Sequence, residues 1–171
     1  IGYTTELPAA DYEPGRPARL KDLWMLSESQ ETVGVGPKQF EEFIFPYQLP
    51  IVEKFGLCYY GCCEPIHSRW EIIERLPHLR KVSISPWCDE EKMAAAMGNR
   101  YNYCRKPNPA LISTAKWDED EILADIRQTL RIAGGCNVEF AMKDVHTLNN
   151  QPHRLGRWVA LARQAIDGHL G

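Results

Sequence analysis

The sequence predicts an α/β fold in which parallel strands alternate with helices. Five short runs rich in apolar, aromatic or β-branched residues recur along the chain, and stretches with helical spacing of apolar residues separate them. Polar and titratable residues follow the end of each run, where parallel α/β folds place their ligand sites. Such alternation implies right-handed crossovers, so we expect the strands to be parallel neighbours in chain order with the helices outside.

The first two expected strands, residues 23–28 and 57–62, enclose one helical stretch. The first is the apolar run DLWMLSE, bounded by charge, and the second is the aromatic-rich GLCYYGC. The glycine-rich ETVGVGP between them predicts a loop. KQFEEFIFPYQLPIVEKFG, residues 38–56, then has apolar side chains at intervals of three and four, which predict one helix.

The third expected strand, residues 81–85, also lies between helical stretches. HSRWEIIERL, residues 67–76, has apolar residues at helical spacing until Pro77 stops it. The strand alternates Val82 and Ile84 with polar neighbours. After it, an aspartate can cap the helix EEKMAAAMG, which a glycine ends.

The last two expected strands are residues 101–104 and 137–143. Between them we expect the loop RKPNPALISTAKW and the amphipathic helix DEDEILADIRQTLRIAGG, with acidic residues at its start and glycines at its end. QPHRLGRWVALARQAIDGHLG predicts a closing helix. Its apolar side is expected to hold Leu155, Trp158, Val159, Leu161, Ala162 and Ile166.

The composition is that of an ordinary globular domain. Of 171 residues, 44% are hydrophobic and 25% are charged. The formal net charge is −3 and no basic run is present, which argues against nucleic acid as a binding partner. No apolar run approaches the roughly 20 residues that a membrane span requires. Without a signal-peptide pattern we expect a cytoplasmic protein, whose six cysteines are free thiols or metal ligands rather than disulfides.

Most of the candidate chemistry follows the ends of the five strands. These residues are Ser27, Glu28, Ser29 and Gln30; Cys62, Cys63, Glu64 and His67; Trp87, Cys88 and Asp89; Cys104, Arg105, Lys106 and Asn108; Lys143, Asp144 and His146. Cysteine is also a small apolar residue that suits buried strand ends, so each thiol has an equally ordinary packing interpretation.

A tetrahedral zinc site needs three or four nitrogen, sulfur or oxygen ligands, which can come from different strands. The candidate ligands are Cys62 or Cys63, Glu64, His67 and His146. No Cys-x-x-Cys is present, and His67 is as readily a capping or surface residue. His146 beside Asp144 is the stronger functional candidate, and we group both with Glu64 as candidate catalytic residues.

Two polar segments predict substrate contacts. In RKPNP, residues 105–109, two prolines fix the loop, and Arg105, Lys106 and Asn108 can bind a carboxylate or phosphate. A solvated Arg–Lys pair is the alternative. Ser27 and Glu28 begin the sequence SES, which lacks the glycine elbow of a serine hydrolase and predicts a polar pocket wall.

With these residues in place, the chain resembles the C-terminal part of the uroporphyrinogen decarboxylase superfamily, which includes corrinoid-linked and zinc-dependent methyltransferases. The resemblance begins near Asp22, and its most specific part is GPKQFEEFIFPYQLPIV, similar to the family's S-P-E-x-F-x-E-F-x-x-P-Y helix. SPWCDEEK and RKPNP look like two further family motifs. DVHTL places His146 where the decarboxylases carry Gly-His-Gly-Leu.

The resemblance also implies cofactors. The methyltransferase branch has His-x-Cys-Gly at the strand that looks like YYGCCEP here, and a further Cys near the closing strand; together they hold zinc. Cys62 matches the first cysteine, Tyr60 stands in place of the histidine, and His146 stands near the last cysteine. Cys62, Cys63 and His146 are therefore the implied metal ligands, with a corrinoid (cobalamin) on a partner protein.

The resemblance further implies a (β/α)8 TIM barrel, which takes about 250 residues. Residues 22–171 would then be the last five βα units of eight, in a single domain whose residues 1–21 form an irregular lead-in. The chain begins at Ile1, as a piece of a longer polypeptide would. Open strand edges predict association with a second copy or with the missing N-terminal half of the barrel.

Three functions are consistent with these features. We favour a corrinoid-linked methyltransferase, in which a sulfur nucleophile takes a methyl group and zinc keeps a thiolate deprotonated. The second is a cofactor-free decarboxylase, a carboxy-lyase whose tetrapyrrole-like or other carboxylated substrate would be held by Arg105, Lys106 or His146. The third is a non-enzymatic corrinoid- or tetrapyrrole-binding module.

Overall fold

Five parallel strands form one sheet in the order β1-β2-β3-β4-β5. The computed structural model describes residue 6 and residues 8–170, so residues 1–5 and 7 of the expected lead-in lie outside the described residues. The strands are Trp24–Ser27 (β1), Leu57–Tyr60 (β2), Leu79–Ile84 (β3), Asn102–Arg105 (β4) and Asn137–Phe140 (β5). The predicted α/β class and the predicted parallel order are confirmed.

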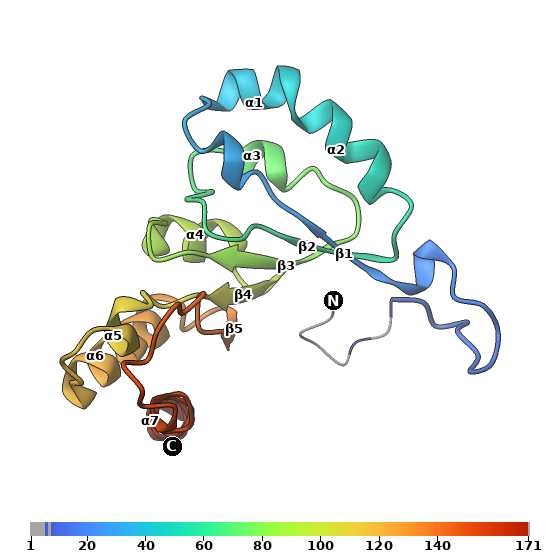
Figure 1. The fold of residues 1–171 in the computed structure, drawn as a ribbon. Helices are drawn as coiled ribbons and strands as arrows, with labels where there is room; N and C mark the ends of the chain where they lie inside the picture. Colours follow the sequence, from blue (N-terminus) through green and yellow to red (C-terminus); the bar gives the residue numbers. More distant parts are fainter. Residues whose placement is uncertain (1–5, 7, 171) are drawn as a thin grey trace.

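The helices follow one another in an arc around one side of this sheet (Figure 1). They are the 3-10 turns Leu20–Asp22 (η1) and Gln30–Thr32 (η2), and the α-helices Pro37–Phe43 (α1), Phe45–Val52 (α2), Trp70–Ile73 (α3), Glu90–Met97 (α4), Ala110–Ser113 (α5), Glu119–Ile132 (α6) and His153–Leu170 (α7). Sequential parallel strands joined by right-handed crossovers place all connecting helices on one face, which explains the arrangement.

The helix expected over residues 38–56 is divided into α1 and α2 at Ile44, whose backbone leaves the helical region (φ −121°, ψ −53°). The cause is Pro46, which has no N–H to donate to the carbonyl four residues earlier. Phe40 and Phe45 flank the break with ring centroids 6.5 Å apart, and both are buried. Packing of these two rings therefore holds the two helices at the break.

Other element boundaries also differ from the expectation. The helix expected over 67–76 is α-helical only in α3, because its last turn tightens into i→i+3 bonds such as Leu76 N to Ile73 O at 3.0 Å. An additional helix, α5, lies in the segment expected to be a loop. The predicted Asp89 cap is confirmed, because its side chain accepts from Lys92 N, and Asp118 additionally caps α6 by accepting from the first-turn amides of Asp120 and Glu121.

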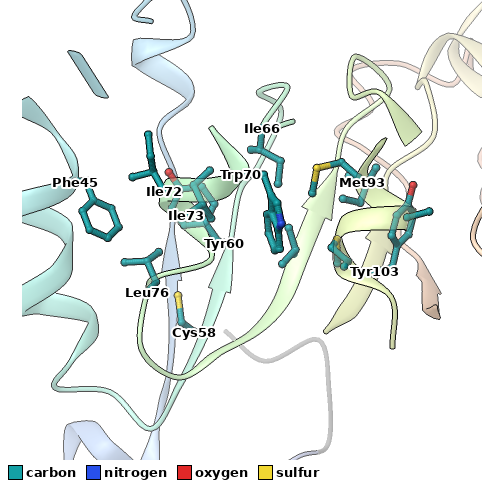
Figure 2. Packing of buried hydrophobic residues seen from close by; sticks show 14 of the residues in the cluster. Phe45, Cys58, Tyr60, Ile66, Trp70, Ile72, Ile73, Leu76, Met93 and Tyr103 are labelled. Atoms are coloured by element: carbon teal, nitrogen blue, oxygen red, sulfur yellow. The ribbon is translucent and has the colours of Figure 1, made fainter. Parts of the chain in front are cut away.

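The main core lies between the sheet and α1 to α4. Cys58, Tyr60 and Tyr103 point from the strands toward Trp70 and Met93 on the helix side, and all are buried (Figure 2). Alternate residues of a strand point to opposite faces, so these side chains fix which face the helices cover. The strand sequences thus carry an apolar face for the helices.

The other face of the sheet carries a polar layer. Tyr59 donates its hydroxyl to Cys104 Sγ at 3.7 Å, and Lys81 is paired with Glu139 across β4. The ammonium group of Lys81 lies 5.0 Å from the centre of the Tyr59 ring. Lys81 is only 1% exposed, so the ion pair and ring satisfy a charge that would otherwise be costly to bury.

A second core cluster joins α5, α6 and α7, and it corrects one expectation about α7. Trp158, Leu161 and Ala162 are buried as predicted, whereas Leu155 is 45% and Val159 is 42% exposed. The buried stripe is rotated from the expected one because the face of α7 that carries Trp158, Leu161 and Ala162 is the one that packs on α6 and α5. No helix in the described part of the chain is long and apolar enough to cross a membrane.

We predict that Arg154→Met will destabilise the fold. Arg154 is 1% exposed and donates to the carbonyls of Ile112 (3.0 Å), Thr114 (2.6 Å) and Ala115 (3.1 Å) at the end of α5. The substitution leaves these acceptors unpaired, so we expect a loss of roughly 3 kcal/mol in the free energy of unfolding, measured by urea denaturation.

Arg157→Met on the same helix is the matched control, because Arg157 pairs with Glu119 at the surface. Its stability should stay close to that of the unmodified chain. Equal losses in the two variants would show that the buried carbonyl contacts do not stabilise α5.

Candidate functional site

The loops that follow β1 and β2 are joined through the buried carboxylate of Glu64. One oxygen accepts the backbone N–H of Ser29 at 2.9 Å, and the other accepts the backbone N–H of Cys62 at 2.9 Å. Glu64 is 3% exposed. Because both oxygens already accept backbone donors, Glu64 positions these loops.

Arg69 makes the second connection between the same two loops. Its guanidinium donates to Ser29 Oγ at 2.9 Å and to Val35 O at 2.6 Å, and it also bonds the carbonyl of Thr32. Its guanidinium carbon lies 4.8 Å from the centre of the Phe40 ring. One buried arginine, at 3% exposure, therefore holds the whole turn between β1 and α1.

The Cys62–Cys63 pair follows immediately after β2, at the C-terminal edge of the sheet, which we call the rim. The two Sγ atoms lie 3.5 Å apart, and both residues are half-buried. Gly61 turns the chain there with a φ of +93°, and a Cβ at this position would lie 3.1 Å from Ser83 Cβ. Ser83 Oγ donates to Cys62 O at 2.9 Å, so the turn is held on both sides.

Burial favours the neutral forms of Cys62 and Glu28. Burial, and then the hydrogen bond with Cys63, raise the pKa of the Cys62 thiol to about 11. Burial also raises the pKa of Glu28, assisted by the negative charges of Glu31 and Glu64. The positive charge of Lys106 acts against the shift in both cases. Cys62 therefore keeps its proton at neutral pH.

Cys104 and Cys88, which were expected on the rim, have packing roles in the structure. Cys104 lies within β4 rather than after it and is fully buried. Cys88 Sγ accepts the backbone N–H of Ile66 at 3.4 Å. Burial raises the pKa of both thiols, so neither is a ready nucleophile.

The two histidines considered as ligands are separated by the fold. His67 Nδ1 accepts the backbone N–H of Asp89 at 3.1 Å and so links the loops after β2 and β3. His146 and Asp144 are exposed in the segment after β5, where Val145 and Leu148 pack on the second core cluster. Among the described residues, no group of three or more His, Cys, Asp or Glu side chains is placed to hold a metal ion.

The expected substrate-binding residues also separate. Arg105 is 4% exposed and faces the helices, where it pairs with Glu90 at 2.9 Å and with Asp125 at 3.4 Å. Asn108 Oδ1 accepts from Ala110 N at 3.0 Å, just before the start of α5. Lys106 lies near the thiols, with its Nζ 5.7 Å from the centre of the Tyr59 ring.

The two candidate residues at the end of β1, Ser27 within the strand and Glu28 after it, take different places. Ser27 is buried at the end of the strand, with its backbone carbonyl accepting Gly61 N at 2.8 Å. Glu28 is half-buried beside the rim, and its carbonyl accepts from the side chain of Gln48. Of the candidate residues, the two thiols are in contact at the rim and Glu64 binds the Cys62 amide, while the charges of Glu28 and Lys106 act on the pKa of Cys62.

The importance of Arg69 was not predicted from the sequence. It lies within HSRWEIIERL, where an arginine between a serine and a tryptophan is expected to be a surface residue. Its partners are 34 and 40 residues away along the chain, so no local pattern indicates them. Only the packing of the two loops identifies it.

A large groove lies away from this site. It has a volume of about 500 Å³ and is lined by small residues of α4 and by the chain that follows α6, with Glu91 and Arg131 at its edge. It is on the outer helix layer and contains no cluster of nucleophilic or metal-binding groups. None of the candidate residues described above lines this groove.

Comparisons of the chain with protein-family models, with curated proteins and with solved structures give no match.

We predict that Glu64→Gln will loosen the two rim loops. The amide keeps one acceptor oxygen, and its NH2 group faces the other backbone N–H, so one buried donor loses its partner. We expect a loss of roughly 2 kcal/mol in the free energy of unfolding. Amide hydrogen exchange should become faster at Ser29 and Cys62.

Glu31→Gln, an exposed change in the loop after β1, is the control and should leave exchange at both amides unchanged. Unaltered exchange in the Glu64 variant would show that its two hydrogen bonds do not hold the loops.

A further prediction concerns Asp125, whose pKa is raised chiefly by burial despite the opposing charge of Arg105. Its Oδ2 atom has no hydrogen-bond partner among the described residues. A carboxyl group with a raised pKa binds its proton more tightly in the folded state. Ionisation above that pKa therefore lowers stability.

Asp125→Asn should consequently be more stable than the unmodified chain at pH 7. The difference should shrink as pH falls through the raised pKa and disappear below about pH 4, where the carboxyl group is neutral in both states. Urea denaturation over this pH range measures it, with the exposed Asp120→Asn on the same helix as control. A gain that does not depend on pH would contradict the assignment.

Proposed function

We propose that this chain is the site-bearing part of a (β/α)8 enzyme of the uroporphyrinogen decarboxylase type, acting in corrinoid-linked methyl transfer. The observation that supports it best is the Cys62–Cys63 pair, two partly exposed thiols in contact at the C-terminal end of a parallel strand. Catalytic groups of barrel enzymes lie at this end of the strands. A thiol is also a strong nucleophile toward methyl donors.

The arrangement of the sheet supports the barrel. The strands follow one another in chain order, the helices lie along one face, and β1 and β5 each have one neighbour in the described sheet. Apolar side chains are exposed at both ends of the arc, on α1 and α2 (Phe43, Tyr47, Ile51) and on α7 (Leu155, Val159). Three further βα units would pair with both free strands and cover both helix surfaces.

Within this proposal the two thiols have different roles. The raised pKa of Cys62 keeps this thiol protonated, and its Sγ lies 3.5 Å from Cys63 Sγ, so we assign Cys63 as the nucleophile. Its sulfur forms the bond to the methyl carbon, while the donor retains the electron pair of the bond that breaks. The thiol proton leaves to solvent, and the positive charge of Lys106 stabilises the negative charge on sulfur. The methylated corrinoid is the substrate that supplies the methyl group.

Zinc is not part of these steps. A catalytic zinc ion takes three protein ligands, and the described residues offer two thiols without a third donor in reach. The expected zinc site stays a prediction, which elemental analysis of the purified protein tests. A cytoplasmic location and a corrinoid-bearing partner protein are likewise proposals.

The alternative function, a cofactor-free decarboxylase, has weaker support. Two of the three groups expected to hold substrate carboxylates lie elsewhere: Arg105 is paired in the helix layer, and His146 is exposed beyond β5. Lys106 alone is near the thiols. A second cation at the rim would be needed to hold a substrate with several carboxylates.

The test is methylation of the protein by methylcobalamin. We expect one methyl group on the peptide that contains residues 62 and 63, found by mass spectrometry, together with loss of the methylcobalamin absorption. Cys63→Ser should abolish it. Cys62→Ala should slow it about tenfold, because the hydrogen bond between the two side chains, worth roughly 1.4 kcal/mol, is lost.

Cys136→Ser is the control, because Cys136 is also half-buried but bonds the carbonyl of Ala94 in the helix layer. It should methylate normally. Methylation that persists in Cys63→Ser would overturn the proposal, and retention of the intact corrinoid without transfer would favour a binding module instead.

A further inference from the structure

The Cys62–Cys63 pair has the geometry of a site for a ligand that takes two sulfur donors. Its Sγ atoms are 3.5 Å apart, against about 2.05 Å in a disulfide. Two bonds of about 2.3 Å meeting near the tetrahedral angle span about 3.8 Å, so one sulfur-binding atom can bridge these thiols with little movement.

The pair is held in place before any ligand arrives. Cys62 donates its backbone N–H to Glu64 and accepts from Ser83 Oγ through its carbonyl, both at 2.9 Å. Gly61, with its positive φ, sets the turn into the pair. A site fixed in this way loses less conformational entropy on binding than two mobile side chains do.

The number of donors restricts the ligand. Zinc and similar tetrahedral ions require a third or fourth protein ligand, and the described residues provide no such group. A trivalent arsenic atom that carries one organic group has only two positions left for sulfur. Its valence therefore matches the pair.

We infer that Cys62 and Cys63 together form a binding site for trivalent organic arsenicals. An arsenical R–As=O reacts with the two S–H groups to form two As–S bonds in a closed ring, and the two protons leave with the oxygen as one water molecule. No electron is transferred, and no third protein ligand is used. The inference concerns the thiols of the proposed function but does not require methyl transfer.

The electrostatics of the site agree with this chemistry. Burial raises the pKa of Cys62 to about 11, which disfavours products that need a persistent thiolate charge. The arsenic–dithiol ring is neutral, so the same burial does not disfavour it. A polar but partly enclosed rim thus suits an uncharged bridged product.

The other cysteines are poorly suited to compete. Cys58 and Cys104 are fully buried, Cys88 bonds Ile66 N, and Cys136 bonds Ala94 O. No other pair of cysteine sulfurs in the described part of the chain is recorded in contact. A reagent that needs two neighbouring thiols should therefore select Cys62 and Cys63.

The experiment is titration of the reduced protein with phenylarsine oxide, followed by intact-mass and peptide mapping. We expect one phenylarsenic group per chain, bound to the peptide with residues 62 and 63. Two titratable thiols should be lost, and an added small dithiol should restore them. Cys62→Ser and Cys63→Ser should each lower the affinity at least tenfold, because one As–S bond cannot close the ring.

Cys88→Ser and Cys136→Ser are the matched controls and should bind like the unmodified chain. Peptide mapping of the unmodified protein identifies the cysteines that bind the arsenical even where a variant folds poorly. Stoichiometric binding that survives in both Cys62→Ser and Cys63→Ser, or an arsenical mapped to another cysteine, would overturn the inference. A protein that binds the arsenical yet takes no methyl group would refute the proposed function alone.

Discussion

The structure of the rim depends on the contacts that Ser29 makes with Glu64 and Arg69. Glu64 binds the Ser29 and Cys62 amides, and Arg69 binds the Ser29 hydroxyl and carbonyls farther along the same loop. Tyr60 completes the set by donating its hydroxyl to Ser29 Oγ at 3.0 Å. These groups are buried, so each depends on the others for its hydrogen bonds, and the loops after β1 and β2 are fixed as one unit.

This fixed unit has a chemical consequence. The two thiols are held in contact at a turn that Gly61 and Ser83 also restrain. Contact between them leaves little room for two negative charges, so one thiol keeps its proton and can serve the other as a donor. The thiol pair is therefore asymmetric even though its members are adjacent and of the same type.

The sheet separates two kinds of charge. On the helix side, Arg105 lies between Glu90 and Asp125, and it ties β4 to α4 and α6. On the opposite side, Lys81 and Glu139 pair within a polar layer. The ion pair satisfies two charges on the face without helices, whereas the arginine on the helix side is part of the packing. The direction of a strand side chain thus decides whether a charged residue can meet a substrate.

The sequence by itself determined the α/β class, the five strands and their parallel order, because apolar periodicity and caps are local properties. It also placed Cys62, Cys63, Glu28 and Lys106 near strand ends. It did not reveal that α1 and α2 break at Ile44, since their long apolar pattern hides the effect of one proline.

Tertiary structure decided which candidate residues share a site. Arg105 and Lys106 are adjacent in sequence, yet Arg105 points to the helices and Lys106 lies by the thiols, because side chains alternate along a strand. Arg69 became important through partners more than 30 residues away. His146 lies apart because its segment packs on the second core cluster. Such long-range contacts leave no periodic signal in the chain, so only the folded structure shows them.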